Sequence, residues 1–147
     1  GALVAADAER LRAVTRRAVG RAAACLDAHD ATGAAERFID FWMGPGSLRS
    51  MPPERQAVVV APTANVRRWW HALSREPAPL RDFASLDMPI LYMLGERSPP
   101  AAHAVAETLC RVLPNVRRMT FEGLGHMAPV THPERVNAAI AEFIRTA

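Results

Sequence analysis

The sequence contains no lysine, and all eighteen of its basic residues are arginine. These arginines are spread along the chain and do not form a run, and the formal net charge is only +3. A nucleic-acid-binding protein usually shows a basic patch or a recognised binding motif. Because the chain shows neither pattern, we expect no nucleic acid among its partners.

Cysteine is also scarce. Cys25 and Cys110 form neither a C-x-x-C pair nor a disulfide framework. Free thiols in helix-like segments are typical of a reducing compartment, so we expect a cytoplasmic protein. The five histidines show no ligand spacing, and there is no H-E-x-x-H motif or Cys/His cluster. We therefore expect no metal site.

Long apolar runs are absent as well. No stretch reaches the roughly 18 apolar residues that a membrane-spanning helix needs, so we expect no membrane span. The N-terminus lacks a signal-peptide pattern, and its leading Gly-Ala without methionine suggests a trimmed or truncated start. The remaining composition, half hydrophobic and 22% charged over 147 residues, is that of a globular protein with a core of its own.

The first half of the chain has the spacing of helices. Apolar residues recur at helical intervals over 2–28 and again over 34–42. A Gly-Pro-Gly turn at 44–46 follows. Pro52-Pro53 begins a third predicted helix that continues to residue 60, and after Pro62 a fourth spans 63–75. We expect a helical layer without strands up to residue 76.

The pattern changes near residue 80. The run Pro89–Leu94 is continuously apolar and stops at a glycine, which is typical of a parallel strand buried on both faces. Ser98-Pro99 resembles an N-cap followed by a proline in the first turn, and it predicts a helix that ends before Pro114. Val116–Phe121 is a second strand, placed near an edge because it contains two arginines. Together these segments predict a right-handed βαβ unit.

The most informative stretch follows the second strand. Gly123-Leu-Gly-His126 places an imidazole on a tight loop at a strand end, where catalytic side chains are often held. The alternative is a loop histidine fixed by local hydrogen bonds. Thr131 and Glu134 form a predicted capping box for a last helix, whose apolar stripe includes Val136, Ile140, Phe143 and Ile144. Two parallel strands alone do not make a stable sheet, so the apolar strand requires neighbours that this sequence does not supply.

Three segments, in this order, resemble the C-terminal half of an α/β-hydrolase. Phe38–Gly46 looks like part of the helical cap, Met88–Gly95 like the penultimate strand, and Phe121–Pro129 like the histidine loop. The resemblance implies a partial α/β-hydrolase fold. It consists of a helical cap-like region over 1–79 and the C-terminal part of the catalytic domain over 80–147, with a βαβ unit of parallel strands and a C-terminal helix.

The resemblance assigns His126 as the catalytic general base and acid. The commonest family pattern places the triad acid where this chain has Ser98, which cannot serve. Glu96 is the substitute that we predict, although it can equally be a surface carboxylate. In other family members the acid follows an earlier strand. The family's G-x-S-x-G nucleophile motif is absent, and Ser47 has neither a preceding strand nor the second glycine.

The nucleophile and the oxyanion hole are therefore expected from a missing N-terminal half. Trp42, beside the Gly-Pro-Gly turn, and Met127, beside His126, are the predicted substrate-binding residues. The alternative for Trp42 is packing between cap helices.

The resemblance implies a serine hydrolase that acts on an ester or a related carbon–carbon or thioester bond. The substrate would be a small apolar or ester molecule, with no cofactor, and the chain alone would be inactive. One alternative is a non-catalytic assembly module that pairs its exposed strand edge with a partner chain or a second copy. Another is a degenerate hydrolase that binds a small apolar ligand.

Overall fold

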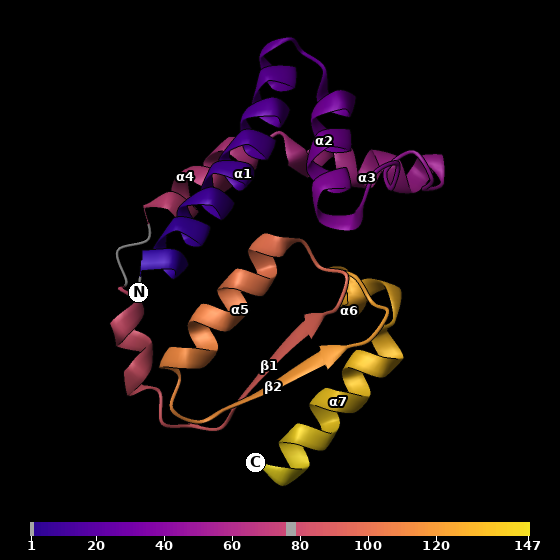
Figure 1. The fold of residues 1–147 in the computed structure, drawn as a ribbon. Coiled ribbons are helices and arrows are strands. Elements are labelled where there is room, and N and C mark those ends of the chain that lie inside the picture. Colours follow the sequence, from indigo (N-terminus) through magenta and orange to yellow (C-terminus); the bar gives the residue numbers. More distant parts are fainter. Residues whose placement is uncertain (1, 76–78) are drawn as a thin grey trace. The chain divides into compact units, whose positions relative to one another are not determined.

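A computed structural model describes residues 2–75 and 79–147 of the chain (Figure 1). The fold is mixed α and β, with more helix than strand. The chain divides into two compact units, Gly1–Pro77 and Ala78–Ala147, and each is described by itself. Among the described residues, no helix combines the length and the apolar character that crossing a membrane requires.

The first unit is built from helices. They are α1 (Ala2–Asp27), α2 (Ala31–Met43), α3 (Pro53–Thr63) and α4 (Val66–Ser74). Several boundaries differ from the sequence prediction, which began α2 at residue 34, ended α3 at 60 and began α4 at 63. Helix α2 begins at Ala31 because the carboxylate of Asp30 caps it, accepting the N–H of Gly33 at 2.7 Å. Helix α3 includes Pro62 because this proline lies in its final turn, where only the last hydrogen bonds of the helix are affected.

Small side chains form the core of the helical unit. Ala22 of α1, Ala34 of α2 and Val66 of α4 are 0%, 0% and 1% exposed, and they pack together with the half-buried Val19 and Phe38. Alanine at such positions lets two helix backbones approach closely. This core therefore holds α1 against both α2 and α4.

The Gly-Pro-Gly turn lies directly after α2. Gly44 and Gly46 have φ angles of 104° and 79°, a left-handed region that favours glycine. The carboxylate of Asp40 accepts the N–H groups of Gly46 at 2.7 Å and Leu48 at 3.2 Å. The turn thereby brings Leu48 into the interior, where it is 1% exposed.

The second unit contains the sheet. Its elements are the 3-10 helix η1 (Leu80–Ser85), β1 (Ile90–Gly95), α5 (Pro100–Val112), β2 (Val116–Phe121), α6 (Ala128–Thr131) and α7 (Pro133–Thr146). The two strands are parallel, with Ile90 opposite Val116 and Gly95 opposite Phe121. Figure 1 shows α5 and α7 on opposite sides of the strand pair. The predicted strand–helix–strand order of parallel strands is confirmed, and β2 has the predicted bounds.

Strand β1 is less buried than its sequence predicts. Leu94 and Gly95 are buried, but the four residues Ile90–Met93 are only half-buried. In the described part of the chain β2 is its one strand partner, so the opposite edge of β1 has no ladder. The prediction of a strand buried on both faces is therefore wrong for most of β1, because the neighbours that would bury it are not present.

The core of this unit lies on the α7 face of the strands. Its buried members are Phe121, Leu124, Ala128, Val136 and Ala139. Met93 of β1, Met119 of β2 and Ile140 of α7 pack against them. The predicted stripe of α7 is thus covered at Val136 and Ile140, whereas Ile144 near its end is 70% exposed.

Two predicted helix caps are wrong. The residue that caps α5 is Pro99, with Pro100 in the first turn, so Ser98 lies one position too early to cap it. Thr131 ends α6, and its hydroxyl donates to the carbonyl of Met127 at 3.2 Å, so no capping box forms. Helix α7 instead follows His132, with no side-chain hydrogen bond at its cap.

Candidate functional site

His126 lies on the loop that joins β2 to α6. On one side of it the loop is anchored by Leu124, which is 5% exposed in the core of the unit. On the other side Ala128 is 3% exposed, and its N–H donates to the carbonyl of Gly125 at 3.1 Å. Gly123 permits the sharp exit from β2 because its φ is 71°. The imidazole is therefore carried on a short segment with a buried side chain close by on each side.

The loop after β1 is hydrogen-bonded to the histidine loop. The N–H of Glu96 donates to the carbonyl of Phe121 at 3.0 Å, and the N–H of Arg97 donates to the carbonyl of Leu124 at 2.8 Å. The N–H of Gly123 donates to the carboxylate of Glu96 at 2.7 Å. Three hydrogen bonds, two between backbone groups and one to a side chain, thus join the two loops beyond the strands.

Gly95 makes this close approach possible. A Cβ atom at this position would lie 2.4 Å from the carbonyl oxygen of Gly125 and 2.7 Å from that of Leu124. Both neighbours are backbone atoms that the loop hydrogen bonds hold in place. The sequence marks Gly95 only as the end of an apolar run, whereas the structure shows that the position of the histidine loop depends on it.

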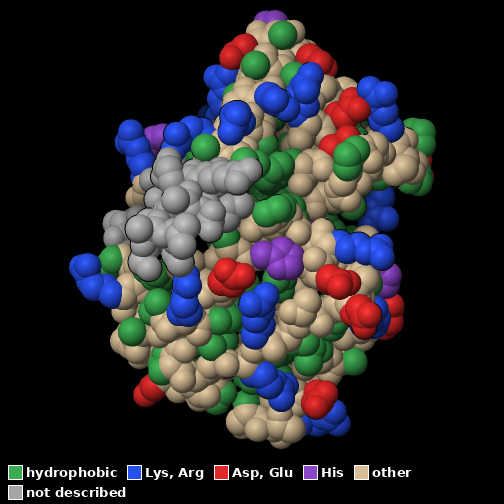
Figure 2. Space-filling model, viewed as in Figure 1, with side chains coloured by type: hydrophobic (Ala, Val, Ile, Leu, Met, Phe, Trp, Pro, Cys, Tyr) green, Lys and Arg blue, Asp and Glu red, His purple; other side chains and the backbone are tan. Residues whose placement is uncertain are grey.

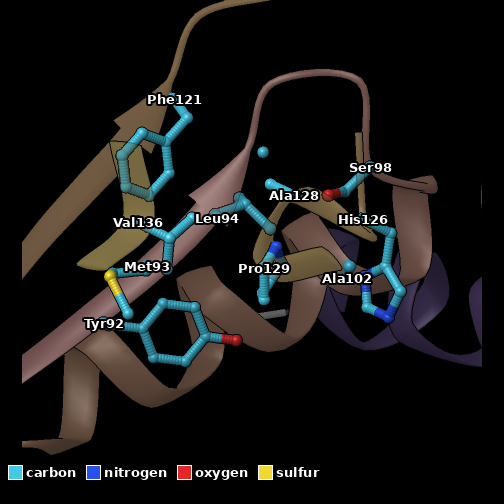
Figure 3. A pocket seen from close by; sticks show the side chains of 11 residues that line it. Tyr92, Met93, Leu94, Ser98, Ala102, Phe121, His126, Ala128, Pro129 and Val136 are labelled. Atoms are coloured by element: carbon cyan, nitrogen blue, oxygen red, sulfur yellow. The ribbon is translucent and has the colours of Figure 1, made fainter. Parts of the chain in front are cut away.

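A hollow of about 190 Å³ lies beside the two loops (Figure 3). Its lining residues are Tyr92, Met93, Leu94, Gly95, Ser98, Ala102, Phe121, His126, Ala128, Pro129 and Val136. The lining includes consecutive residues of β1 together with residues of the two loops and of α5, α6 and α7. Apolar side chains form most of the wall, and polar groups come from Tyr92, Ser98 and His126.

The electrostatic state of His126 follows from its surroundings. The side chain is exposed on one side, but burial of the rest lowers the pKa of the imidazole below its ordinary value of 6.5. A carboxylate acting on the ring would raise the pKa instead. At neutral pH the ring is therefore neutral, with one nitrogen able to accept a proton, as a general base requires.

Two hydroxyl groups share the hollow with His126. Ser98 is 6% exposed, and its Oγ is buried without a hydrogen-bond partner. Figure 3 shows this hydroxyl directed inward, toward Ala128. Tyr92 of β1 is half-buried, and burial raises the pKa of its phenol, with Cys110 raising it further and Arg118 lowering it. Neither residue was predicted as part of a site, because their burial depends on how the loops pack.

Glu96 takes part in the hydrogen bonds of the two loops. Its carboxylate accepts the N–H of Gly123, and its backbone carbonyl lies 3.0 Å from Nε2 of His103. The carboxylate thus binds the histidine loop at Gly123, which lies three residues before His126 along the chain. Its assignment as the triad acid stays a prediction.

The two predicted substrate-binding residues, Met127 and Trp42, belong to different units of the chain. Met127 is half-buried at the start of α6, where its carbonyl accepts the N–H groups of Val130 at 2.9 Å and Thr131 at 3.0 Å. Trp42 belongs to the helical unit and packs edge-on against Phe41, with ring centroids 5.0 Å apart. It therefore has a packing role within α2, and its predicted contact with a substrate stays a prediction.

Two other sites can be assessed in the described part of the chain. Ser47 lies in the turn after α2, where its N–H donates to the carbonyl of Gly44 at 3.2 Å, so it is not on a strand-to-helix elbow. No group of three or more described His, Cys, Asp or Glu side chains has a geometry that could hold a metal ion. On the face shown in Figure 2, carboxylates lie among the arginines.

Comparison with known proteins gives no assignment. No model of a protein family matches the chain, and no curated protein matches it. A functional proposal therefore rests on the geometry of the His126 loop and on the three segments that resemble an α/β-hydrolase.

Proposed function

We propose that this chain supplies the general-base histidine and the lid of an α/β-hydrolase-type serine hydrolase. The bond cleaved is an ester or a related carbon–carbon or thioester bond. The observation that carries the proposal is His126, a neutral imidazole held at the carboxyl end of a parallel strand beside an apolar hollow. The order of the cap-like, strand and histidine-loop segments supports the same reading.

The proposed reaction is acyl transfer through a serine that lies outside residues 1–147. His126 accepts the proton of the serine hydroxyl while the serine oxygen attacks the substrate carbonyl. The protonated imidazole then returns that proton to the leaving group as the acyl-enzyme forms. Water completes the cycle by the same proton transfers in reverse order. The lowered pKa keeps the ring neutral at physiological pH, which is the form that accepts the proton in the first step.

Fixing the loop serves this chemistry. A general base must remain within hydrogen-bond reach of the proton that it removes, and small displacements are costly. The hydrogen bonds from Glu96, Arg97 and Gly123 restrict the loop that carries His126. The second unit is therefore organised to present one imidazole at a defined position.

Hydrolysis of p-nitrophenyl butyrate tests the proposal. The chain is produced together with the polypeptide encoded immediately upstream of it, and the initial rate is measured with and without each component. We expect hydrolysis only when both are present. His126→Ala should lower kcat by at least about a hundredfold, the usual contribution of a general base. His132→Ala is the matched control, because His132 lies at the start of α7 and outside the hollow lining.

Two results would contradict the proposal. One is that the mixture shows no hydrolysis of any activated ester although both polypeptides are folded. The other is that the His126→Ala and His132→Ala mixtures hydrolyse the ester equally fast.

A second candidate function is assembly through β1. The N–H groups of Ile90 and Glu96 donate toward the β2 side, at 2.9 Å and 3.0 Å, to residues 115 and 121. Strand alternation then directs the N–H and C=O groups of Leu91 and Met93 to the opposite edge. An unpaired edge of this kind is a template for another strand.

Size-exclusion chromatography with light scattering tests this second candidate. If the edge pairs, the chain should dimerise as its concentration rises. Leu91→Pro should prevent dimerisation, because proline removes a donor at the free edge and leaves the β2 ladder intact. A stable monomer over the whole concentration range would exclude self-pairing.

A further inference from the structure

We propose that the hollow beside His126 binds a small neutral molecule made of one aromatic ring or a short acyl chain, with a single hydroxyl or carbonyl oxygen held by Ser98. This inference uses the site of the proposed function and names the group that it would accept. It concerns binding by this chain alone and requires no nucleophile.

The hydroxyl of Ser98 carries the inference. A buried polar group that lacks a hydrogen-bond partner is destabilising, and most such groups in folded proteins are satisfied. Ser98 is 6% exposed, yet its Oγ has no partner in the described structure. The nearest structural use, capping α5, is excluded because Pro99 is the capping residue. The hydroxyl therefore keeps both its donor and its acceptor for a molecule in the hollow, toward which it points (Figure 3).

The size of the hollow limits the ligand. An apolar protein cavity of about 150 Å³ accommodates one benzene molecule. The present hollow measures about 190 Å³, with walls from Leu94, Phe121 and Val136. It therefore has room for a single ring, or for a short branched acyl chain, together with one polar substituent.

The charge of the hollow selects a neutral ligand. Among the described residues that line it, none is an arginine, an aspartate or a glutamate. Since burial lowers the pKa of His126, the imidazole also adds no positive charge at neutral pH. A carboxylate would lose its hydration here without gaining a counter-ion, whereas an alcohol or a carbonyl needs only a hydrogen bond.

A matched pair of probes tests the inference. Toluene and benzyl alcohol share one ring and differ by one hydroxyl group, and benzoate carries a charge in the same place. Binding to the full chain is followed by NMR of methionine labelled at its methyl carbon, since Met93 lies in the wall. In the wild type both neutral probes should shift the Met93 signal, and benzoate should not.

The decisive quantity is the ratio of the toluene Kd to the benzyl alcohol Kd. Ser98→Ala should lower this ratio about tenfold, the usual value of one hydrogen bond, by weakening benzyl alcohol alone. Ser85→Ala is the control, because its hydroxyl donates to the carbonyl of Asp82 on η1 and lies outside the hollow lining. Ser98→Ala should not lower the Tm, since it removes an unsatisfied group.

Three outcomes would overturn the inference. One is a Kd ratio that Ser98→Ala leaves unchanged. Another is tighter binding of benzoate than of benzyl alcohol, and the third is a Met93 signal that no probe shifts. None of them depends on ester hydrolysis, so failure of this inference and failure of the proposed hydrolase are separately visible.

Discussion

The two units of the molecule close their cores to different extents. In the helical unit the central residues Ala22, Ala34 and Val66 are 0–1% exposed. In the sheet unit Ala106 of α5 is 0% exposed, but the cluster on the α7 face is 3–8% exposed and most of β1 is only half-buried. A helix satisfies its backbone within itself, whereas a strand needs a neighbour on each side. Helices α1–α4 therefore satisfy most of their backbone groups internally, whereas β1 keeps an open edge among the described residues.

In the sheet unit, a hollow lined in part by β1 contains the polar groups of Tyr92, Ser98 and His126. The helical unit instead uses its turn carboxylate, Asp40, for the backbone of its own chain. Each unit thus uses a carboxylate to bind its own backbone, Asp40 in one and Glu96 in the other, whereas the Ser98 hydroxyl of the sheet unit is buried without a partner.

The largest expected effect is at Gly95. Gly95→Ala should lower the free energy of unfolding of the sheet unit by more than about 3 kcal/mol, because its Cβ meets two backbone oxygens. Labelling with 3-fluorotyrosine reports this unit by 19F NMR, since Tyr92 is the single tyrosine. Tryptophan fluorescence reports the helical unit, which contains all three tryptophans.

Gly20→Ala is the control for this comparison. Gly20 is an exposed position inside α1, and a Cβ there meets nothing within 4 Å. The replacement should raise the stability of the helical unit by about 0.5–1 kcal/mol. Equal stability of the Gly95→Ala and wild-type sheet units would show that the loops are not packed as described.

The next largest effect should be confined to the helical unit. Leu48→Ala should cost about 2–3 kcal/mol, because it leaves a cavity around a side chain that is 1% exposed. The loss should be visible in tryptophan fluorescence during urea unfolding. Leu73→Ala, at a position 74% exposed on α4, should change stability by less than about 0.5 kcal/mol. Similar losses for the two variants would mean that this core is not closed.

A smaller effect is expected at Glu96. Glu96→Gln weakens the hydrogen bond from the Gly123 N–H by removing the acceptor's charge, and it should cost about 1 kcal/mol. Hydrogen exchange at the Gly123 amide should become faster. Glu107→Gln, on the exposed side of α5, is the matched control and should leave this amide unchanged. If the Gly123 amide stayed equally protected in the Glu96→Gln variant, the Glu96 carboxylate would not be the group that holds this amide.

The smallest effect is the pH dependence of stability due to His126. Its pKa is lowered in the folded state, so the folded protein binds fewer protons than the unfolded chain below pH 6.5. Stability should therefore fall as the pH decreases from 6.5 to the folded pKa, and then level off. His126→Gln should reduce this slope in urea titrations read by the tyrosine label, and His132→Gln should retain it. A slope of the opposite sign would mean that a carboxylate stabilises the imidazolium.

The sequence predicted the two strands, the helix between them and the loop that carries His126, but not the 3-10 helix η1 or the short helix α6. Val116–Phe121 is a strand with the predicted bounds, and a helix joins it to the apolar strand before it. The caps were mispredicted for two local reasons. Pro99 takes the capping position of α5 in place of Ser98, and Thr131 belongs to the short helix α6. Burial of β1 could not be predicted, because the amount of strand covered depends on residues far away in the chain.

The candidate site shows the same division. The Gly-x-Gly-His pattern predicted His126 as the base, a role that stays a prediction. Glu96 was predicted as the triad acid or a surface carboxylate. Its hydrogen bond to Gly123 could not be foreseen, since it depends on how two loops approach. The sequence indicates the close approach at Gly95 only weakly, because glycine is also common where a strand simply ends. Ser98 was considered only as a helix cap and as a residue that cannot serve as the triad acid.

Labelling with a fluorophosphonate probe, which reacts with activated serines, tests the proposed role of His126 most directly. The chain and the polypeptide encoded upstream of it are mixed, treated with the probe, and the modified serine is located by mass spectrometry. We expect the label on a serine of the upstream polypeptide, with a rate at least about a hundredfold lower for His126→Ala and unchanged for His132→Ala. A label on Ser47, or a rate indifferent to His126, would contradict the proposal that this loop presents the base of a serine hydrolase.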